Sequence, residues 1–441
     1  MQLTVQEVLD AVNGVLLFGN TSDKLEYVSK NSGENIEGRV FIPLKAKRDG
    51  HEFIADAVSN GAIGYFTEND EIISCRFAIK VSDTKKALGD LAKYVLSKAK
   101  AKVIAITGSV AKTTTRQYIA GVLAEIGKTA ASIENFNNDI GLPLSVLEMD
   151  GDEDFIVLEM GMNNLGEISY LSNIAKPDIA VITLIGTSHI GNLGSRENIL
   201  KAKLEILDGL KENGLLILNG DDPILCSLKE KYNPKYYGSP ILTVIKDSPN
   251  GEFIIDGERF HIASDGIHNI TNASCAVLIG KMLGGTPEQI RKGLKRFRQE
   301  KYRNEVYEIS GKTMIVDCYN SSLESVKANL SSLKKRDAKR KVAILGSIGE
   351  ADGHLEEILK NVGKAVFENK IDLLICVDEN ANLIIESAIE AGMQKESTIY
   401  FKTKESLYKE INNILKEGDT ILIKASRSYK FEEIADFLKC H

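Results

Sequence analysis

The clearest chemical signal lies between Thr107 and Thr115, which read Thr-Gly-Ser-Val-Ala-Lys-Thr-Thr-Thr. The apolar run Val103 to Ile106 predicts a buried strand before them, and Thr113 to Ile126 has the apolar spacing of a helix. A strand, a glycine-containing turn, a lysine and a helix together predict a phosphate-binding loop, because backbone N–H groups and the helix N-terminus meet an anion there. The expected loop consists of Gly108, Ser109, Val110, Ala111, Lys112, Thr113 and Thr114.

Within this loop, Lys112 supplies a positive charge and Thr113 can offer a hydroxyl to Mg²⁺. One residue departs from the usual pattern: Ala111 stands before the lysine, where such loops usually carry glycine. If this position requires a positive φ, the Cβ atom of alanine costs about 1–2 kcal/mol.

Two further candidates follow predicted strands. Glu159 lies near the end of the strand Phe155 to Gly161, and His189 follows the strand Asp178 to Ile185. The carboxyl ends of strands are where ligands bind in doubly wound sheets. We interpret Glu159 as a Mg²⁺ ligand rather than as a capping or surface residue, since hard cations prefer carboxylate oxygen. For His189 a structural hydrogen-bonding role is as well supported by the pattern.

The spacing alone gives weaker signals elsewhere. Lys203 lies on a predicted helix, Ser195 to Glu212, and periodicity favours a solvated lysine there. His268 to Asn272 opens another helix, and because Asn is a common N-cap, capping alone could explain Asn269.

The elements around these residues predict an α/β protein with three domains. The length of 441 residues exceeds one core. Strands and helices are mixed in 1–98, whereas 99–302 alternates apolar strands with helices, as in a parallel sheet covered on both faces. Residues 303–441 alternate again and predict a second doubly wound domain. A small antiparallel excursion is expected over 238–261, with turns at Pro249-Asn-Gly and Asp256-Gly.

Composition excludes several classes of protein. The net charge of −7 and the lack of a long basic run argue against nucleic-acid binding. The six cysteines include no C-x-x-C pair, which argues against a cysteine zinc site. The N-terminus has no apolar signal core, and no apolar run approaches the roughly 20 residues that span a bilayer. We expect a cytoplasmic, monomeric protein without membrane partners.

Six segments, taken together, resemble the Mur ligases. They occur in order and at family spacing, and the likeness extends over essentially the whole chain. They are TGSVAKTTT (107–115), NFNNDIGLPL (135–144), LEMGMNNLGEI (158–168), PDIAVITLIGTSHIGNLGSRENILKAKLEI (177–206), LNGDDP (218–223) and HNITNA (268–273).

The resemblance implies a UDP-substrate domain, a central P-loop ATPase-type domain and a C-terminal Rossmann-like domain that brings the amine. It also implies a reaction: ATP phosphorylates a carboxylate, an amine attacks the acyl phosphate, and an amide and phosphate result. The branch that adds D-alanyl-D-alanine to UDP-N-acetylmuramoyl-tripeptide is the most similar. The Asp-Asn-Pro-Arg motif of the branches that add diaminopimelate or lysine is absent.

The same resemblance implies roles for residues of this chain. Lys112, Glu159, His189 and Lys203 would be catalytic, with Thr113, Glu159, His189 and a carbamylated Lys203 holding Mg²⁺, two ions in the family. Besides the loop, Asn269, Asn272, Arg303 and Asp317 would contact ATP. The carboxylate and amine substrates would meet Asp49, His51, Asn135, Asn137, Asn138, Tyr319, Asn320, Lys424, Ser426 and Arg427.

Some residues depart from the family pattern. The chain reads Lys30-Asn31-Ser32 where relatives carry Asp-Ser-Arg in the UDP-binding part, and Leu184 replaces an Asn. Three readings therefore stay open. The first is the ligase just described, the second a paralogue that joins an amino acid or dipeptide to a carboxylate without UDP, and the third a catalytically weak nucleotide-binding partner.

Overall fold

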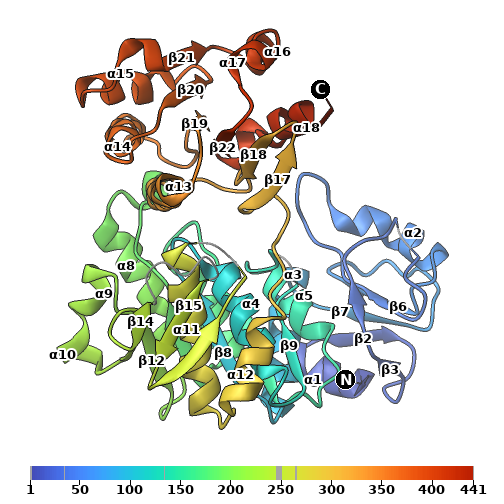
Figure 1. Cartoon of the computed structure of the whole chain (residues 1–441). Coiled ribbons are helices and arrows are strands. Elements are labelled where there is room, and N and C mark those ends of the chain that lie inside the picture. The colour runs from blue at the N-terminus through green and yellow to red at the C-terminus, as the bar shows by residue number, and fades with distance from the viewer. Residues whose placement is uncertain (1, 34, 134, 245–250, 264–265, 441) are drawn as a thin grey trace.

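The computed structural model describes residues 2–33, 35–133, 135–244, 251–263 and 266–440. It contains three α/β units that follow one another along the chain (Figure 1), which agrees with the predicted fold class. Among the described helices, none is long and apolar enough to cross a membrane.

The first unit is built on a five-stranded sheet in the order β2-β7-β6-β5-β4, in which only the β2–β7 pair is antiparallel. A small β1–β3 ribbon lies beside it. Its elements are β1 (Leu3–Thr4), α1 (Val5–Val12), β2 (Val15–Phe18), β3 (Lys24–Leu25), β4 (Val28–Ser29), β5 (Val40–Phe41), η1 (Gly50–Phe53), α2 (Ile54–Ser59), β6 (Gly64–Thr67), β7 (Phe77–Lys80) and α3 (Thr84–Lys98).

The central unit carries a six-stranded, fully parallel sheet in the order β13-β12-β11-β8-β10-β9. Its elements are β8 (Lys102–Thr107), α4 (Lys112–Leu123), β9 (Thr129–Ala131), α5 (Gly141–Leu147), β10 (Phe155–Glu159), α6 (Glu167–Ala175), β11 (Ile179–Ile182), α7 (Ile190–Leu193), α8 (Arg196–Leu204), η2 (Glu205–Asp208), β12 (Leu215–Asn219), α9 (Pro223–Cys226), α10 (Lys229–Tyr232), β13 (Lys235–Tyr237), β14 (Leu242–Val244), β15 (Glu252–Ile255), β16 (Glu258–His261), α11 (Ile267–Met282) and α12 (Pro287–Leu294).

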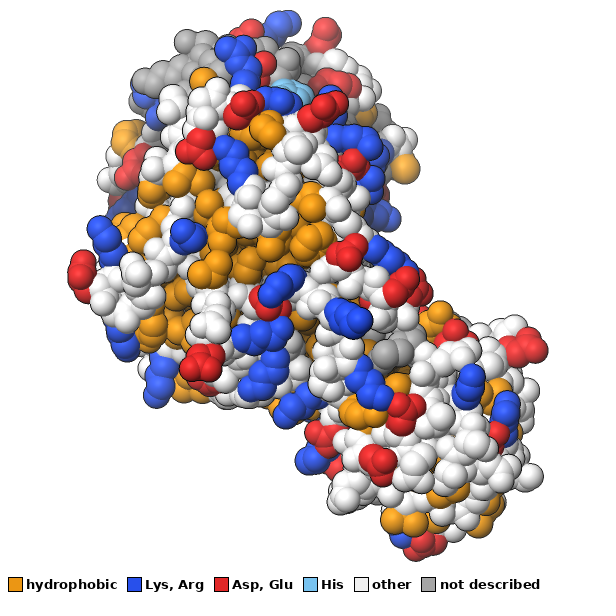
Figure 2. Space-filling model, turned by 90° about the horizontal axis from the view of Figure 1, so that it is seen from below, with side chains coloured by type: hydrophobic (Ala, Val, Ile, Leu, Met, Phe, Trp, Pro, Cys, Tyr) orange, Lys and Arg blue, Asp and Glu red, His pale blue; other side chains and the backbone are white. Residues whose placement is uncertain are grey.

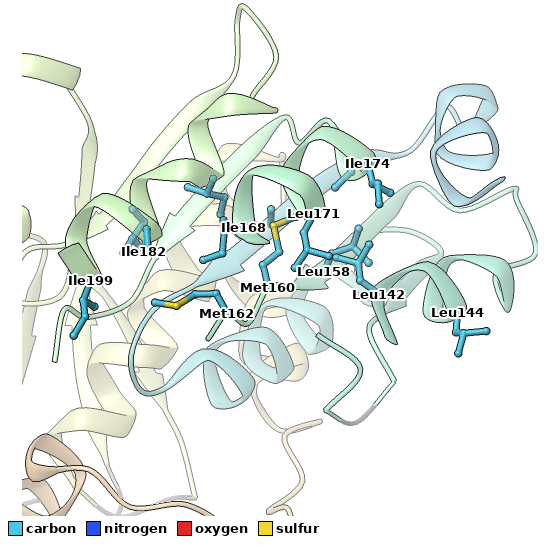
Figure 3. Packing of buried hydrophobic residues seen from close by; sticks show 14 of the residues in the cluster. Leu142, Leu144, Leu158, Met160, Met162, Ile168, Leu171, Ile174, Ile182 and Ile199 are labelled. Atoms are coloured by element: carbon cyan, nitrogen blue, oxygen red, sulfur yellow. The ribbon is translucent and has the colours of Figure 1, made fainter. Parts of the chain in front are cut away.

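Successive residues of this sheet enter two separate cores. Val103 and Ala105 of β8 belong to the core that holds α5, α6 and α8, whereas Ile104 and Ile106 belong to the core that holds α4, α11 and α12. This alternation follows from the two-residue period of a strand, and it explains why the strands are apolar throughout. Figure 3 shows the first of these cores, where Leu158 and Met160 lie near Ile168 and Leu171 of α6.

The antiparallel excursion predicted for 238–261 is present as the sheet β14-β15-β16. The predicted turn at Asp256-Gly joins β15 to β16, and Asp256 has a φ of 51°. The other predicted turn, at Pro249-Asn-Gly, falls largely outside the described residues.

The third unit has the sheet order β17-β18-β22-β19-β20-β21, with β17 antiparallel at one edge and the other strands parallel. Figure 1 places it above the central unit, with α13 and one end of β17 on the side that faces this unit. Its elements are β17 (Glu305–Ile309), β18 (Lys312–Val316), α13 (Leu323–Lys335), β19 (Arg340–Leu345), α14 (Leu355–Glu368), β20 (Leu373–Val377), α15 (Asn382–Glu390), η3 (Lys395–Ser397), β21 (Thr398–Phe401), α16 (Lys404–Tyr408), α17 (Ile411–Ile414), β22 (Asp419–Lys424), η4 (Arg427–Tyr429) and α18 (Glu432–Cys440).

The surface seen in Figure 2 carries acidic and basic side chains mixed together, with hydrophobic side chains gathered in the middle of the larger lobe. Two ion pairs join the first unit to the central one: Arg39 with Glu148 and Lys85 with Asp139. Neighbouring Glu148 raises the pKa of Arg39. The chain thus fixes the first unit against α5 through charges as well as through the shared apolar core.

Candidate active site

The predicted phosphate loop joins β8 to α4 at the middle of the central sheet. Gly108, directly after the strand, has a φ of 148°, and a Cβ atom there would lie 1.9 Å from the Thr183 hydroxyl oxygen. Only glycine avoids this clash. The helix begins at Lys112, so the loop N–H groups lie at a helix N-terminus, the arrangement that binds phosphate.

Ala111 adopts the left-handed conformation, with φ 67° and ψ 1°. The position therefore has the positive φ that the usual glycine serves, and alanine occupies it with a strain of about 1–2 kcal/mol. The backbone of Thr115 still donates to the Ala111 carbonyl at 2.9 Å. The first hydrogen bonds of α4 thus form normally although alanine occupies a left-handed position.

The chain after β11 closes around this loop. Ser109 N–H donates to the Leu184 carbonyl at 2.8 Å, the Thr183 hydroxyl donates to the Val110 carbonyl at 2.6 Å, and Gly186 N–H donates to the Ser109 hydroxyl oxygen at 2.9 Å. The apolar run had predicted a strand as far as Ile185. These three hydrogen bonds to the loop explain why β11 already ends at Ile182. Leu184 acts here through its backbone, so the family's Asn side chain is not needed for this contact.

Lys112 extends back over the loop, and its Nζ donates to the Gly108 carbonyl at 2.8 Å. Burial lowers the pKa of Lys112, while the Glu159 carboxylate opposes that shift and the positive charge of Arg303 adds to it. Thr113 is buried at the second position of the helix, and Thr114 follows it. Lys112 and Thr113 thus lie at the N-terminus of α4, at the end of the predicted phosphate loop.

Glu159 is the last residue of β10 and pairs in register with Ile106 of β8, next to the loop. It is only 1% exposed, so a surface role is ruled out. Asn137 donates to its Oε1 at 2.9 Å, and its other oxygen, Oε2, lies 3.8 Å from the Nε of Arg116. The Asn137 amide therefore orients Oε1, whereas Oε2 faces the buried guanidinium of Arg116.

His189 precedes α7 and has a φ of 63°. Its Nδ1 lies 2.8 Å from the carboxylate of Glu350 in the third unit, although not in the geometry of a hydrogen bond. The proximity of His189 lowers the pKa of Glu350. A second contact with the third unit is a hydrogen bond, which the Thr187 hydroxyl donates to Glu324 at 3.1 Å. The third unit thus brings two carboxylates to the strand end that precedes His189.

Lys203 is fully buried on α8, so its interpretation as a solvated lysine was wrong. Its ammonium has no hydrogen-bond partner. Burial lowers the pKa of Lys203 well below its ordinary value, and the charge of Lys112 adds to the effect, while Glu159 opposes it. Burial of an amine without a hydrogen-bond partner favours its uncharged form, because desolvation disfavours the ammonium.

Among the described residues, six buried side-chain atoms lack a hydrogen-bond partner, and five of them belong to the surroundings of the phosphate loop. Buried polar atoms are rarely left unpaired, and a cluster of them marks a position for an ion or ligand. Of these atoms, the Glu159 carboxylate oxygen is the type of ligand that Mg²⁺ prefers, whereas the nitrogens of Arg116 and Lys203 cannot bind the ion while they are charged. The five atoms are Thr115 Oγ1, Arg116 Nε, Glu159 Oε2, His189 Nδ1 and Lys203 Nζ.

The residues expected at the adenine lie on α11. Asn269 and Asn272 are both buried. The helix begins at Ile267 and is preceded by Gly266, so Asn269 is not its N-cap and the capping interpretation was wrong. Both amides lie within the first two turns of the helix.

Arg303 and Asp317 lie where the chain enters the third unit. Arg303 stacks on the ring of Tyr319, with 4.0 Å between guanidinium carbon and ring centre. Asp317 accepts hydrogen bonds from the backbone of Asn304 and from Lys424, so its carboxylate holds this junction together.

Four more of the predicted substrate residues gather around this junction. Lys424 is 1% exposed and donates to the carbonyl of Asn320 at 3.1 Å. Ser426 is buried and receives the Gly349 N–H at 2.8 Å, and Arg427 lies over the Tyr319 ring at 5.8 Å. The structure therefore brings Tyr319, Asn320, Lys424, Ser426 and Arg427 together at one end of the third sheet.

The loop 135–144 approaches the site from the side of β10. Asn137 bonds to Glu159, whereas the exposed Asn138 caps α5 by accepting from Gly141 N–H at 2.8 Å. Asn135 is exposed, and its carbonyl accepts from Asn137 N–H at 2.8 Å. Lys30 of the altered first-unit motif lies 5.7 Å from the ring centre of Phe136 in this loop.

Asp49 and His51 form a closed unit within the first domain. His51 Nδ1 lies 2.6 Å from Asp49, and its Nε2 accepts from Glu68 N–H at 3.1 Å. Hydrogen bonds from His51 lower the pKa of Asp49. Both ring nitrogens are engaged, so this pair shapes its loop through the protein's own contacts.

Three charged residues of this site were not selected from the sequence: Arg116, Glu300 and Glu350. Arg116 lies four residues after Lys112 and so on the same side of α4, which was the one available signal. Glu300 and Glu350 reach the site only through the folding of distant segments, which spacing cannot reveal.

Comparison with known proteins identifies two family domains in this chain. Residues 106–280 match the Mur ligase middle domain, and residues 302–427 match the Mur ligase glutamate ligase domain. The UDP-N-acetylmuramoyl-tripeptide–D-alanyl-D-alanine ligase of Bacillus subtilis is 36% identical over 445 residues, which cover 98% of this chain and 97% of that protein.

Two crystal structures have the same fold over nearly their whole length. MurF from Acinetobacter baumannii gives a TM-score of 0.90 at 27% identity and covers 99% of each chain. MurF from Thermotoga maritima in complex with ADP gives 0.82 at 26% identity, covering 94% of this chain and 97% of that one. With both family domains matched and a full-length relative above 30% identity, this chain belongs to the Mur ligase family.

Proposed function

We propose that this protein is an ATP-dependent ligase that joins D-alanyl-D-alanine to UDP-N-acetylmuramoyl-tripeptide through an acyl phosphate. The supporting observation is the cluster of unpaired buried atoms from Glu159, His189 and Lys203 beside the phosphate loop. The names of the full-length relatives supply the two substrates. This cluster argues against a merely nucleotide-binding partner, which would not need it.

The chemistry assigns a task to each group. A carboxylate oxygen is a poor leaving group, and its phosphorylation provides a good one. ATP and the acceptor carboxylate are both anions, so they can meet only where positive charge compensates them. Lys112 provides one such charge, and Mg²⁺, which polarises the phosphoryl oxygens when bound, would be held by Thr113, Glu159 and His189.

Lys203 enters this proposal as a carbamate. A neutral amine can attack CO₂ to form a carbamate, in which a C–N bond forms and one proton leaves. The product would be an anion whose oxygens could hold a second Mg²⁺, in place of a buried donor without a partner. The low pKa of Lys203 and its lack of a partner support the assignment.

The remaining roles follow the three units. With boundaries proposed at 98/99 and 302/303, the first domain takes the UDP moiety, the central domain takes ATP on the loop with Asn269 and Asn272, and the third takes the amine. Arg303 and Asp317 reach ATP from the junction. Asn135, Asn137 and Asn138 face the acceptor, with Asp49 and His51 shaping the UDP loop, whereas Tyr319, Asn320, Lys424, Ser426 and Arg427 lie on the amine side. We also propose that the protein is cytoplasmic and monomeric.

The acceptor is the point to test, because Lys30-Asn31-Ser32 departs from the family motif and Lys30 lies near Phe136 in the acceptor loop. Phosphate release would be measured with ATP, Mg²⁺ and D-alanyl-D-alanine, with and without UDP-N-acetylmuramoyl-tripeptide. We expect strong stimulation by the UDP substrate. No stimulation would reject this acceptor, and release driven by a carboxylate without UDP would favour the paralogue.

A further inference from the structure

Glu300 joins the helix of the phosphate loop to the segment that leads into the third unit. Its Oε1 accepts from Arg116 at 3.2 Å and from Gln117 at 2.9 Å, both on α4. Its Oε2 accepts from the Nε of Arg303 at 2.9 Å. One carboxylate thus connects α4 with the arginine expected to reach the nucleotide.

Packing does not explain this arrangement. The Glu300 side chain is 26% exposed and lines an open groove of about 400 Å³ together with Arg296 and Arg298. Arg116, in contrast, is almost fully buried and is also fixed by a hydrogen bond to the Ser132 carbonyl. Arg116 therefore has a fixed position, and Glu300, which bonds to both arginines, fixes Arg303 relative to it.

Arg303 is connected to the helix of the phosphate loop through Glu300. Its Nε donates to Glu300, and its guanidinium stacks on the ring of Tyr319. Its positive charge also contributes to lowering the pKa of Lys112. An arginine held by Nε and by its face keeps its terminal nitrogens for a phosphate oxygen.

The backbone on both sides of Arg303 is unusual. Tyr302 has a φ of 63° and Asn304 a φ of 54°, the left-handed region that residues other than glycine seldom adopt. Tyr302 N–H donates to Glu305 at 2.7 Å, and Asn304 N–H donates to Asp317 at 3.2 Å. Strained backbone fixed by several hydrogen bonds is found where a side chain must be held in one orientation.

We propose that Glu300 is a positioning residue that aims Arg303 at the terminal phosphate of ATP and ties it to α4. The inference rests on the proposed function, since it requires a nucleotide on the phosphate loop. Glu300 would act only through Arg303 and would not contact the nucleotide itself.

A double-mutant cycle on the full chain tests this. Binding of a non-hydrolysable ATP analogue and of ADP, each with Mg²⁺, would be measured by calorimetry for the wild type, Glu300→Ala, Arg303→Ala and the double variant. We expect Glu300→Ala to weaken the ATP analogue about fivefold and Arg303→Ala about tenfold. The double variant should match Arg303→Ala within about twofold, because residues in one network are not additive. ADP affinity should change less than about twofold.

Two controls keep the result clear. Glu308→Ala removes a carboxylate of β17 that accepts a hydrogen bond from Thr313 in the same hairpin, and we expect wild-type binding. Glu300→Gln keeps the size and shape of the side chain. It replaces Glu300→Ala in the cycle if Glu300→Ala unfolds at a lower temperature than the wild type. We expect an intermediate loss for it, since the amide oxygen still accepts one hydrogen bond.

The outcomes separate the two proposals. Additive effects of Glu300 and Arg303, or equal losses for ADP and the ATP analogue, would overturn the positioning role while leaving the ligase intact. Unchanged binding in Glu300→Ala would overturn it too. A wild-type protein that binds neither nucleotide would instead overturn the proposed function.

Discussion

The Nε of Arg116 and the Oε2 of Glu159 face each other across 3.8 Å, and neither atom has a hydrogen-bond partner. A hydrogen-bonded ion pair would bring them to about 2.8 Å. Arg116 is held back by Ser132 and Glu300, while Ser132 also receives the Glu159 backbone N–H at 2.9 Å. The pair therefore neutralises buried charge while leaving one carboxylate oxygen available to a cation.

This arrangement predicts the behaviour of Glu159→Gln. The amide keeps the size of the side chain and can still meet Asn137, but it removes the negative charge that would hold Mg²⁺. We expect the Mg²⁺ concentration for half-maximal activity to rise at least about tenfold, since ligand changes at metal sites have effects of this size. Titration of Mg²⁺ in the phosphate-release assay measures it. An unchanged Mg²⁺ dependence would remove Glu159 from the metal site.

Lys203→Ala tests the carbamate through activity. Loss of the proposed metal-binding anion should lower phosphate release by about 100-fold, because metal ligands contribute several kcal/mol to the transition state. A short-chain carboxylate such as acetate should restore part of the activity by occupying the vacated space. Lys201→Ala, on the exposed side of the same helix, is the control and should behave as wild type. Full activity of Lys203→Ala would exclude the assignment.

Stability as a function of pH tests the same lysine without catalysis. The pKa of Lys203 is lowered by burial, so the unfolded chain binds more protons than the folded one below the ordinary lysine value. Stability should therefore rise as the pH increases from neutrality toward about 10. Lys203→Met has no titrating group, so its thermal midpoint in CO₂-free buffer should be about 2 °C higher near pH 7 and should vary less with pH.

Bicarbonate provides the internal comparison for that experiment. Added bicarbonate should raise the thermal midpoint of the wild type, since a carbamate needs no buried ammonium, and should leave Lys203→Met unchanged. A pH profile that is the same in both proteins would contradict the burial of a free amine. An equal response to bicarbonate would contradict its modification.

Ala111→Gly tests the strain in the phosphate loop. Glycine removes the left-handed penalty of about 1–2 kcal/mol but costs about 0.5–1 kcal/mol in backbone entropy. We expect a net gain of about 0.5 kcal/mol in stability, measured by urea unfolding, with nucleotide affinity within about twofold of wild type.

Gly108→Ala gives the opposite expectation in the same loop, because its Cβ would collide with Thr183. We expect loss of nucleotide binding in that variant, measured by the same calorimetry. Normal binding by Gly108→Ala, or a marked loss by Ala111→Gly, would contradict the observed backbone path of the loop.

Much of the fold was predictable because its signals are local. The strands predicted over Val103–Ile106 and Phe155–Gly161 are present as β8 (Lys102–Thr107) and β10 (Phe155–Glu159), since short apolar runs between turn signals leave little choice. The edge strand β17 has no such apolar run, because its alternating burial includes charged residues and its partner β18 is needed to define it. The phosphate loop was predicted because its strand, turn and helix are consecutive.

The sequence by itself thus determined the strand-loop-helix motif, the succession of α/β units and the chemical types of the site residues. Only the tertiary structure decided how these residues are used. It buried Lys203, although the periodicity of its helix had predicted a solvent-exposed side chain, and it set Arg116 beside Glu159. It also joined Glu300 to α4, more than 180 residues earlier in the chain. The physical reason is that burial and charge pairing depend on neighbours that packing supplies, and no periodicity along the chain encodes which neighbours those are.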